Sequence, residues 1–285
     1  MSTILSWVIK ILFSCAAAVM LCYKVDWVQF SLSCERIQMM DLFFVFLLYN
    51  LSQVLSAHRS YLYLRLIDVH VDRISNLCLC YVGMFYNLFL PGGIGGDAYK
   101  VYQLRKYHQG RTFAIVQAMI FDRLNGFLGL LVIAAFALYF SDSAWPFLNI
   151  LWSLPIVMAL LVVVCANIQR SWFKYDLWTF LNTLALSVLS QLIQTFVALY
   201  LLFAMGEMQH IVVYALVFLT SSIIAQLPIS LGGLGARELT VFYLLNIIGI
   251  SPEFGVAMAV CFFVVQTLSN CLGAAFIHRE LKLAA

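Results

Sequence analysis

Long apolar runs, separated by short polar connections, set the pattern of this sequence. A helix needs about 20 mostly apolar residues to cross a bilayer, and six runs have roughly that length. The six predicted transmembrane helices are residues 4–23, 40–57, 112–140, 145–166, 177–205 and 254–277. Two further apolar runs, residues 74–90 and 211–227, are shorter and end where the sequence turns to proline and glycine. The pattern therefore predicts membrane helices along almost the whole chain.

The two shorter runs end at related motifs. The first is Leu90-Pro91-Gly92-Gly93-Ile94-Gly95-Gly96-Asp97, and the second is Leu227-Pro228-Ile229-Ser230-Leu231-Gly232-Gly233. Proline cannot continue a helix from its interior, and paired glycines release the backbone from helical geometry. In lipid, a broken helix is tolerated only where protein or a water-filled cavity surrounds it. Each motif therefore predicts a re-entrant hairpin, in which the chain enters the membrane, turns and leaves on the same face.

The distribution of positive charge predicts the orientation. Only Lys24 and Arg36 lie in connections on one side of the predicted topology, and we expect eleven basic residues on the side of the termini. Because cytoplasmic loops carry an excess of lysine and arginine, both termini are predicted to be cytoplasmic. The eleven residues are Arg59, Arg65, Arg73, Lys100, Arg105, Lys106, Arg111, Arg170, Lys174, Arg279 and Lys282.

The spacing of the two motifs predicts an inverted repeat. Their prolines are 137 positions apart (228 minus 91), and the same offset maps each predicted element of the first half onto one of the second. We therefore predict two halves, residues 1–140 and 141–285, with hairpins at about residues 74–110 and 211–249. The expected fold is an all-α integral membrane protein with six transmembrane helices, two re-entrant broken-helix hairpins and an inverted-topology repeat. Transporters of this kind bind substrate near the bilayer midplane, where the hairpin tips would meet.

Composition supports the membrane assignment. Of 285 residues, 64% are hydrophobic and 10% are charged, and the mean hydropathy is +0.97. A soluble domain is roughly 45–50% apolar and about 25% charged, so a soluble globular protein is excluded. We expect residues 4–23 to be a retained span and not a removed signal, and a bridge between Cys22 and Cys34 is an open alternative. No nucleotide loop, Ser-His-Asp order or metal cluster occurs, so we predict no cofactor, metal or nucleic-acid partner.

The candidate substrate-binding residues lie in or near the two motifs, apart from Asp122 and Arg123. A broken helix exposes backbone N–H groups and a positive dipole end, which suits an anion such as phosphate. The alternative is that the glycines allow a tight helix crossing. The predicted substrate-binding residues are Asn87, Gly92, Gly93, Gly95, Gly96, Asp97, Lys100, Asp122, Arg123, Ser230, Gly232, Gly233, Arg237 and Glu238.

The hypothesis of an anion-binding site depends mainly on Arg237. A mid-membrane arginine costs at least roughly 2.5–3.5 kcal/mol unless it is paired or hydrated. Adjacent helical residues do not face each other, so Arg237 and Glu238 each need a partner. We interpret Arg237 as a phosphate ligand and Glu238 as a structural or proton-coupling partner. The alternatives for this pair are that it neutralises its surroundings or that Arg237 extends its charged end to the membrane surface. For Asp97, the alternative is that it caps the helix that follows it.

These residues also resemble a known family. Three motifs are similar to the membrane region of the lysylphosphatidylglycerol synthase/flippase family. They are Asn87-x-x-x-Pro91-Gly92-Gly93-x-Gly95-Gly96-Asp97, Asp122-Arg123 and Leu227-Pro228-Ile229-Ser230-x-Gly232-Gly233-x-Gly235-x-Arg237-Glu238. The resemblance covers nearly the whole chain, although family members commonly have Glu-Arg in place of Asp122-Arg123. It implies a flippase-like role without synthase activity, because the aminoacyl-transferring domain of bifunctional members is not among these residues.

We therefore expect a lipid flippase or transporter in the plasma (bacterial inner) membrane. Its substrate would be an anionic lipid, either a phospholipid or a polyprenyl-phosphate-linked glycolipid, and a proton or another ion is an open choice of coupling partner. The first alternative is a membrane-embedded transferase that acts on a lipid phosphate, although no catalytic base or metal carboxylate pair is evident. The second is a structural subunit, which would not need buried charges beside duplicated breaks.

Overall fold

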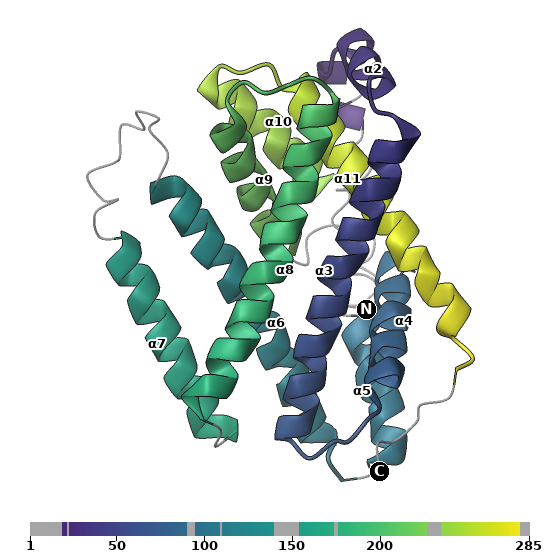
Figure 1. Cartoon of the computed structure of the whole chain (residues 1–285), viewed down its shortest axis with the longest axis vertical. Helices are drawn as coiled ribbons and strands as arrows, with labels where there is room; N and C mark the ends of the chain where they lie inside the picture. The colour runs from purple at the N-terminus through teal and green to yellow at the C-terminus, as the bar shows by residue number, and fades with distance from the viewer. Residues whose placement is uncertain are drawn as a thin grey trace, which may run out of the picture. The chain divides into compact units, whose positions relative to one another are not determined.

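The regular elements of the structure are helices (Figure 1). This computed structural model describes residues 19–21, 23–89, 95–108, 110–139, 154–173, 176–226 and 235–279. Within these ranges the chain forms no β-strand. The helices are α2 (Trp27–Glu35), α3 (Met39–Leu66), α4 (Arg73–Phe89), α5 (Gly95–Tyr107), α6 (Thr112–Tyr139), α7 (Leu154–Phe173), α8 (Leu177–Ala204), α9 (Ile211–Gln226), α10 (Ala236–Ile248), α11 (Glu253–Cys271) and the 3-10 helix η3 (Leu272–Phe276).

Five helical segments are long and apolar enough to cross a membrane. They are Met39–Leu66, Thr112–Tyr139, Pro155–Phe173, Leu177–Ala204 and Glu253–Phe276. These segments overlap five of the six spans that the hydrophobic pattern predicts. The remaining predicted span, residues 4–23, lies almost entirely outside the described residues. The apolar helix Ile211–Gln226 is shorter, as predicted for the element that precedes the second motif.

The outer faces of these helices are apolar. Ile156, Leu160 and Val163 on α7 are 64%, 60% and 54% exposed within the protein. Soluble proteins rarely expose such a continuous apolar face to water. The exposure therefore agrees with lipid contact along α7.

Helix α3 is longer than predicted. The expected span ended at Ala57 and was followed by a connection that contains Arg59, but the helix continues to Leu66. No proline or glycine occurs between Met39 and Leu66, so no residue interrupts the helical hydrogen bonds. The helix ends where Asp68 adopts a left-handed conformation (φ 52°) and the Val69 N–H donates to the Leu64 carbonyl. Arg59 consequently lies inside a helix and is buried, so its placement in a surface connection was wrong.

The chain divides into two compact units, each assembled from separated segments. Unit 1 comprises Met1–Asn50, Cys78–Lys100 and Gln194–Arg279, and unit 2 comprises Leu51–Leu77, Val101–Ile193 and Glu280–Ala285. Both units take segments from both halves of the sequence. The predicted repeat, with its division after residue 140, stays a prediction.

Each unit has its own apolar core. In unit 1, α9, α10 and α11 pack together around residues such as Phe218, Val241 and Phe262 (Figure 1). In unit 2, α6 packs against α7, and Leu128 and Phe180 lie at the centre of a smaller cluster. These packed helices hold the polar residues described next.

Candidate functional site

Asn87 and Gly96 join the two helices that border the first motif. The Asn87 Oδ1 accepts a hydrogen bond from the Gly96 N–H at 2.7 Å. The first N–H groups of a helix have no partner within that helix, and Gly96 is the second residue of α5. Asn87 therefore satisfies a backbone amide that we had predicted to be free for the substrate. Residues 90–94, including the predicted ligands Gly92 and Gly93, lie outside the described residues.

Gly96 also permits a close approach of α5 to α4. A Cβ atom added at Gly96 would lie 2.1 Å from the Gly83 carbonyl oxygen. The ring centroids of Tyr86 and Tyr99 are 4.6 Å apart in the same contact. These contacts bring the backbones of α4 and α5 together, so packing by itself accounts for a glycine at position 96.

We expect Gly96→Ala to destabilise the protein by about 1–3 kcal/mol, the usual cost of overpacking. The added methyl group would collide with backbone, which cannot move aside as a flexible side chain can. Thermal unfolding of the purified variant in detergent measures the effect. Ala98→Leu is the matched control, because Ala98 is exposed on the same helix. Equal unfolding temperatures for the two variants would contradict this packing role.

Asp97 and Lys100 form an ion pair on α5. The Lys100 Nζ lies 3.7 Å from the Asp97 Oδ1, one helical turn away. Helix α5 begins at Gly95, so Asp97 lies inside the first turn and not at the N-cap position. A carboxylate there is stabilised by the positive end of the helix dipole.

Glu238 closes the N-terminal end of α10. Its buried side chain accepts a hydrogen bond from the Gly235 N–H, with 2.8 Å between Oε2 and the nitrogen. Gly235 has a φ of 83°, a conformation that glycine adopts without strain. Glu238 therefore has a backbone partner at the start of its own helix, and its role as a partner of Arg237 stays a prediction. Ser230, Gly232 and Gly233 lie outside the described residues.

Arg237 lies against two aromatic rings in unit 1. Its guanidinium carbon is 4.4 Å from the ring centroid of Phe262 and 5.4 Å from that of Phe218. The Phe262 ring packs edge-on against Tyr49, with 5.6 Å between centroids. A cation over aromatic faces is stabilised by their electron density. The Arg237 Nε is buried and has no hydrogen-bond partner among the described residues. Arg237 therefore has donor capacity that the described part of the chain does not use.

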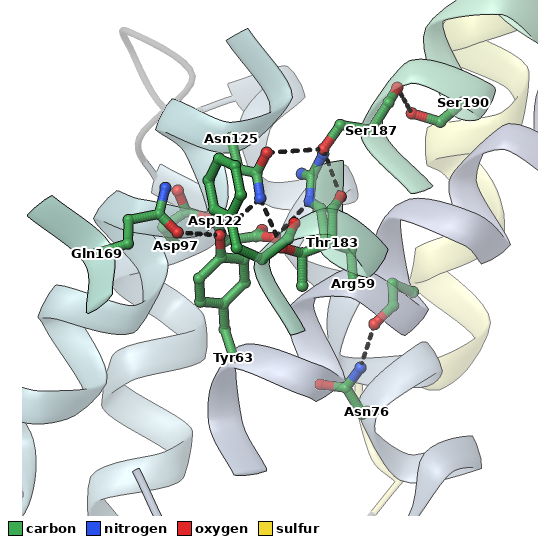
Figure 2. Close-up of polar contacts among 12 residues, drawn as sticks. Arg59, Tyr63, Asn76, Asp97, Asp122, Asn125, Gln169, Thr183, Ser187 and Ser190 are labelled. Atoms are coloured by element: carbon green, nitrogen blue, oxygen red, sulfur yellow. Dashed lines mark hydrogen bonds and ion pairs between the residues drawn. The ribbon is translucent and has the colours of Figure 1, made fainter. Parts of the chain in front are cut away.

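Asp122 belongs to a buried polar network in unit 2 (Figure 2). The Arg59 Nε on α3 donates to the Asp122 Oδ1 on α6 at 2.7 Å, and the Arg59 Nη1 donates to the Ser187 Oγ on α8 at 2.8 Å. Both members of the ion pair are buried. Arg59 thus connects three helices through charge-assisted hydrogen bonds, which are stronger than neutral ones.

Asn125 extends this network by one turn of α6. Its Nδ2 donates to the Tyr63 hydroxyl at 2.7 Å and to the Thr183 Oγ1 at 2.8 Å, and the Tyr63 hydroxyl donates to the Gln169 Oε1 at 2.7 Å (Figure 2). Each of these side chains is buried. A buried network whose members are bonded to one another holds its helices in one arrangement.

Two glycines on α6 make room for the network. A Cβ added at Gly126 would lie 3.0 Å from the Arg59 Nη1, and one added at Gly129 would lie 2.7 Å from the Ser187 Cβ. Small residues at helix contacts let membrane helices approach closely enough for polar side chains to bond. The pairing of α6 with α3 and α8 therefore depends on these glycines.

A comparison with known families decides the class of this protein. The family model described as the lysylphosphatidylglycerol synthase TM region matches residues 7–273. The chain belongs to this family. A search among curated proteins finds no match. Membership and the five apolar helices together make the chain a multi-pass membrane protein of a family linked to lipid flippase and synthase functions.

In this member of the lysylphosphatidylglycerol synthase TM-region family, the predicted site residues fall into separate groups. Arg237 and Glu238 follow the second motif, while Asn87, Gly96, Asp97 and Lys100 lie in or beside the first. Asp122 lies in the other compact unit, where Arg59 binds it, and its neighbour Arg123 is exposed on α6. Assignment of these residues to a substrate site remains a prediction.

Arg59 was not predicted from the sequence as a member of a buried cluster. Two signals pointed to it. No helix breaker separates it from the apolar run before it, and Asp122 is an acidic residue in an otherwise apolar helix that needs a positive partner. Asp122 was predicted only as a substrate-binding residue, and no partner on another helix was assigned to it.

Proposed function

We propose that this protein is a flippase that moves an anionic lipid between membrane leaflets. The observation that carries the proposal is Arg237, a cation with a buried Nε that the described residues leave without a hydrogen-bond partner. Guanidinium binds phosphate with two parallel hydrogen bonds, and the aromatic rings of Phe218 and Phe262 hold it in place. The headgroup phosphate binds Arg237 while the acyl or prenyl tail stays in the bilayer.

The proposed architecture has six transmembrane helices and two re-entrant hairpins that form an inverted repeat. Support comes from the short helices: α4 has 17 residues and α9 has 16, fewer than the roughly 20 that a complete crossing needs. Each is followed by a 13-residue helix that packs against it, α5 after α4 and α10 after α9. The charge distribution favours cytoplasmic termini in a plasma (bacterial inner) membrane.

We assign the substrate to phosphate-bearing lipids, either phospholipids or polyprenyl-phosphate-linked glycolipids. In this proposal, transport is driven by an ion gradient or by removal of the transported lipid. Among the residues that the structure describes, Glu238 and Asp122 are the buried carboxylates, and either would accept a proton. Protonation of either would weaken a contact that the structure contains, with Gly235 or with Arg59 respectively.

Reconstitution of the purified protein into unilamellar vesicles tests this function. A reductant added outside the vesicles bleaches a fluorescent phosphatidylglycerol analogue in the outer leaflet. Flippase activity appears as a change with time in the fraction of the analogue that is protected from bleaching. We expect faster exchange than in protein-free vesicles and in vesicles that contain an unrelated multi-pass protein. Equal rates in all three would exclude transport of that lipid.

The alternative is a transferase that modifies a lipid phosphate in the membrane. The same vesicles, extracted after incubation and analysed by mass spectrometry, distinguish the two functions. Unchanged lipid that has crossed the bilayer supports the flippase. A covalently altered lipid that requires the protein would favour the transferase.

A further inference from the structure

A groove between α3 and α4 in unit 2 has the features of a second lipid site. It has a volume of about 310 Å³, and its lining includes Val54, Tyr61, Arg73, Ile74, Asn76 and Leu77. Its walls are mostly apolar. Val54 and Ile74 are 41% and 56% exposed, so the groove is open on one side. An open apolar groove on a membrane helix pair suits an acyl chain better than a water-soluble ligand.

Positive charge lies at one end of this α3–α4 groove. The guanidinium carbon of Arg73 is 5.7 Å from the ring centroid of Tyr61, and that of Arg65 is 6.0 Å from the same centroid. Asp72 is the neighbouring acid, but it does not line the groove, and its Oδ2 accepts the N–H groups of Ile74 and Ser75. The groove entrance therefore favours an anion such as a lipid phosphate.

Asn76 contributes a hydrogen-bond acceptor that calls for a donor on the bound ligand. Its Nδ2 donates to the Ala57 carbonyl at 2.8 Å, a contact visible in Figure 2, and this bond determines which end of the amide is the oxygen. The Oδ1 is buried and has no hydrogen-bond partner among the described residues. A buried acceptor without a donor costs free energy, so a ligand that donates an O–H or N–H there would be stabilised.

We propose that the α3–α4 groove binds a membrane phospholipid whose headgroup carries a hydroxyl or ammonium donor. Arg73 binds the phosphate, Asn76 Oδ1 accepts a hydrogen bond from the headgroup, and one acyl chain lies along Val54, Ile74 and Leu77. The groove residues belong to unit 2 and Arg237 belongs to unit 1, so the proposal assigns the two lipids to different units. The lipid there is a retained component of the protein and not its cargo.

Native mass spectrometry of the delipidated protein tests this site. The protein is titrated with one phospholipid at a time: phosphatidylglycerol, phosphatidylethanolamine or phosphatidylcholine. We expect phosphatidylethanolamine to bind more tightly than phosphatidylcholine, since both are zwitterionic and only the former has N–H donors for Asn76. We expect Arg73→Gln to weaken phosphatidylglycerol binding about tenfold or more, as expected for loss of a charged hydrogen bond.

Arg170→Gln is the matched control. Arg170 borders another groove, of about 220 Å³, which Asp176 also lines. That carboxylate repels a lipid phosphate, so the groove beside Arg170 should not bind phosphatidylglycerol. The control variant should therefore bind this lipid like the wild type. Arg237→Gln should also keep the groove lipid, which separates this proposal from the proposed transport function.

Three results would overturn the proposal. One is equal phosphatidylglycerol affinity in the wild type and Arg73→Gln. Another is equal affinity of the wild type for phosphatidylethanolamine and phosphatidylcholine. A groove filled by a co-purifying protein helix would appear as an added polypeptide mass with no bound lipid, and it would also contradict the assignment. Because Arg73 is exposed, its substitution leaves folding intact, and thermal unfolding of the variant verifies this.

Discussion

Arg59→Leu is expected to reduce the free energy of unfolding by about 3–5 kcal/mol, the largest stability effect that we predict for any single substitution. The guanidinium of Arg59 binds Asp122 and Ser187, and both members of the ion pair are buried. Removal of one partner leaves the Asp122 carboxylate in an apolar environment without its counter-charge. Unfolding of the purified protein in mixed micelles, followed by circular dichroism, measures the change.

A matched substitution separates this effect from a general loss of positive charge. Arg65 lies on the same helix in its last turn and is exposed, so Arg65→Leu should change stability by less than about 0.5–1 kcal/mol. The double variant Arg59→Leu/Asp122→Leu should recover much of the loss, because two well-packed apolar side chains often replace a buried ion pair at little cost. Equal stabilities of Arg59→Leu and Arg65→Leu would contradict a structural role for the pair.

The network also predicts a functional separation. If Asp122 holds α6 to α3, the double variant should fold and transport lipid at a rate comparable to that of the wild type. If Asp122 binds substrate or carries a coupled proton, the double variant should fold and remain inactive. The vesicle assay on this one folded variant therefore distinguishes the structural interpretation from the predicted site role of Asp122.

Arg237→Gln is expected to reduce lipid transport by at least about 30-fold, which corresponds to loss of a buried, charged contact with the substrate. Glutamine has neither the charge nor the two parallel donors that guanidinium offers to a phosphate. Arg237→Lys should retain part of the activity, because it keeps the charge and loses the planar fork. Initial rates in the vesicle assay, normalised to the amount of reconstituted protein, measure both variants.

Stability should change much less than transport in Arg237→Gln. The contact with Phe218 and Phe262 contributes about 0.5–2 kcal/mol, and the buried Nε has no hydrogen bond to lose among the described residues. Glu238→Gln is a suitable companion, because its side-chain oxygen can still accept the Gly235 N–H. Wild-type transport in well-folded Arg237→Gln would remove the basis of the proposed site, and a loss in Glu238→Gln with intact folding would implicate the carboxyl proton.

The positions of the helices could be predicted from the sequence because they depend on local properties. The length of an apolar run determines whether a helix can cross the bilayer, and the described segments agree with this for Thr112–Tyr139, Leu177–Ala204 and Glu253–Phe276. Proline and glycine also act locally, since they remove a hydrogen bond or free the backbone wherever they occur. The ends of α4 and α9 before the two motifs were predicted on that ground.

The partners of the polar side chains were decided by the tertiary structure. Arg59 and Asp122 are 63 residues apart, and no local rule indicates that α3 and α6 meet at these two positions. The same is true of Asn87, which binds the Gly96 amide because Gly83 and Gly96 let two helices touch. Composition and breakers determine where helices run in this chain. Which charges neutralise each other depends on contacts that form only when those helices pack, because a buried ion pair is stable only in its packed geometry.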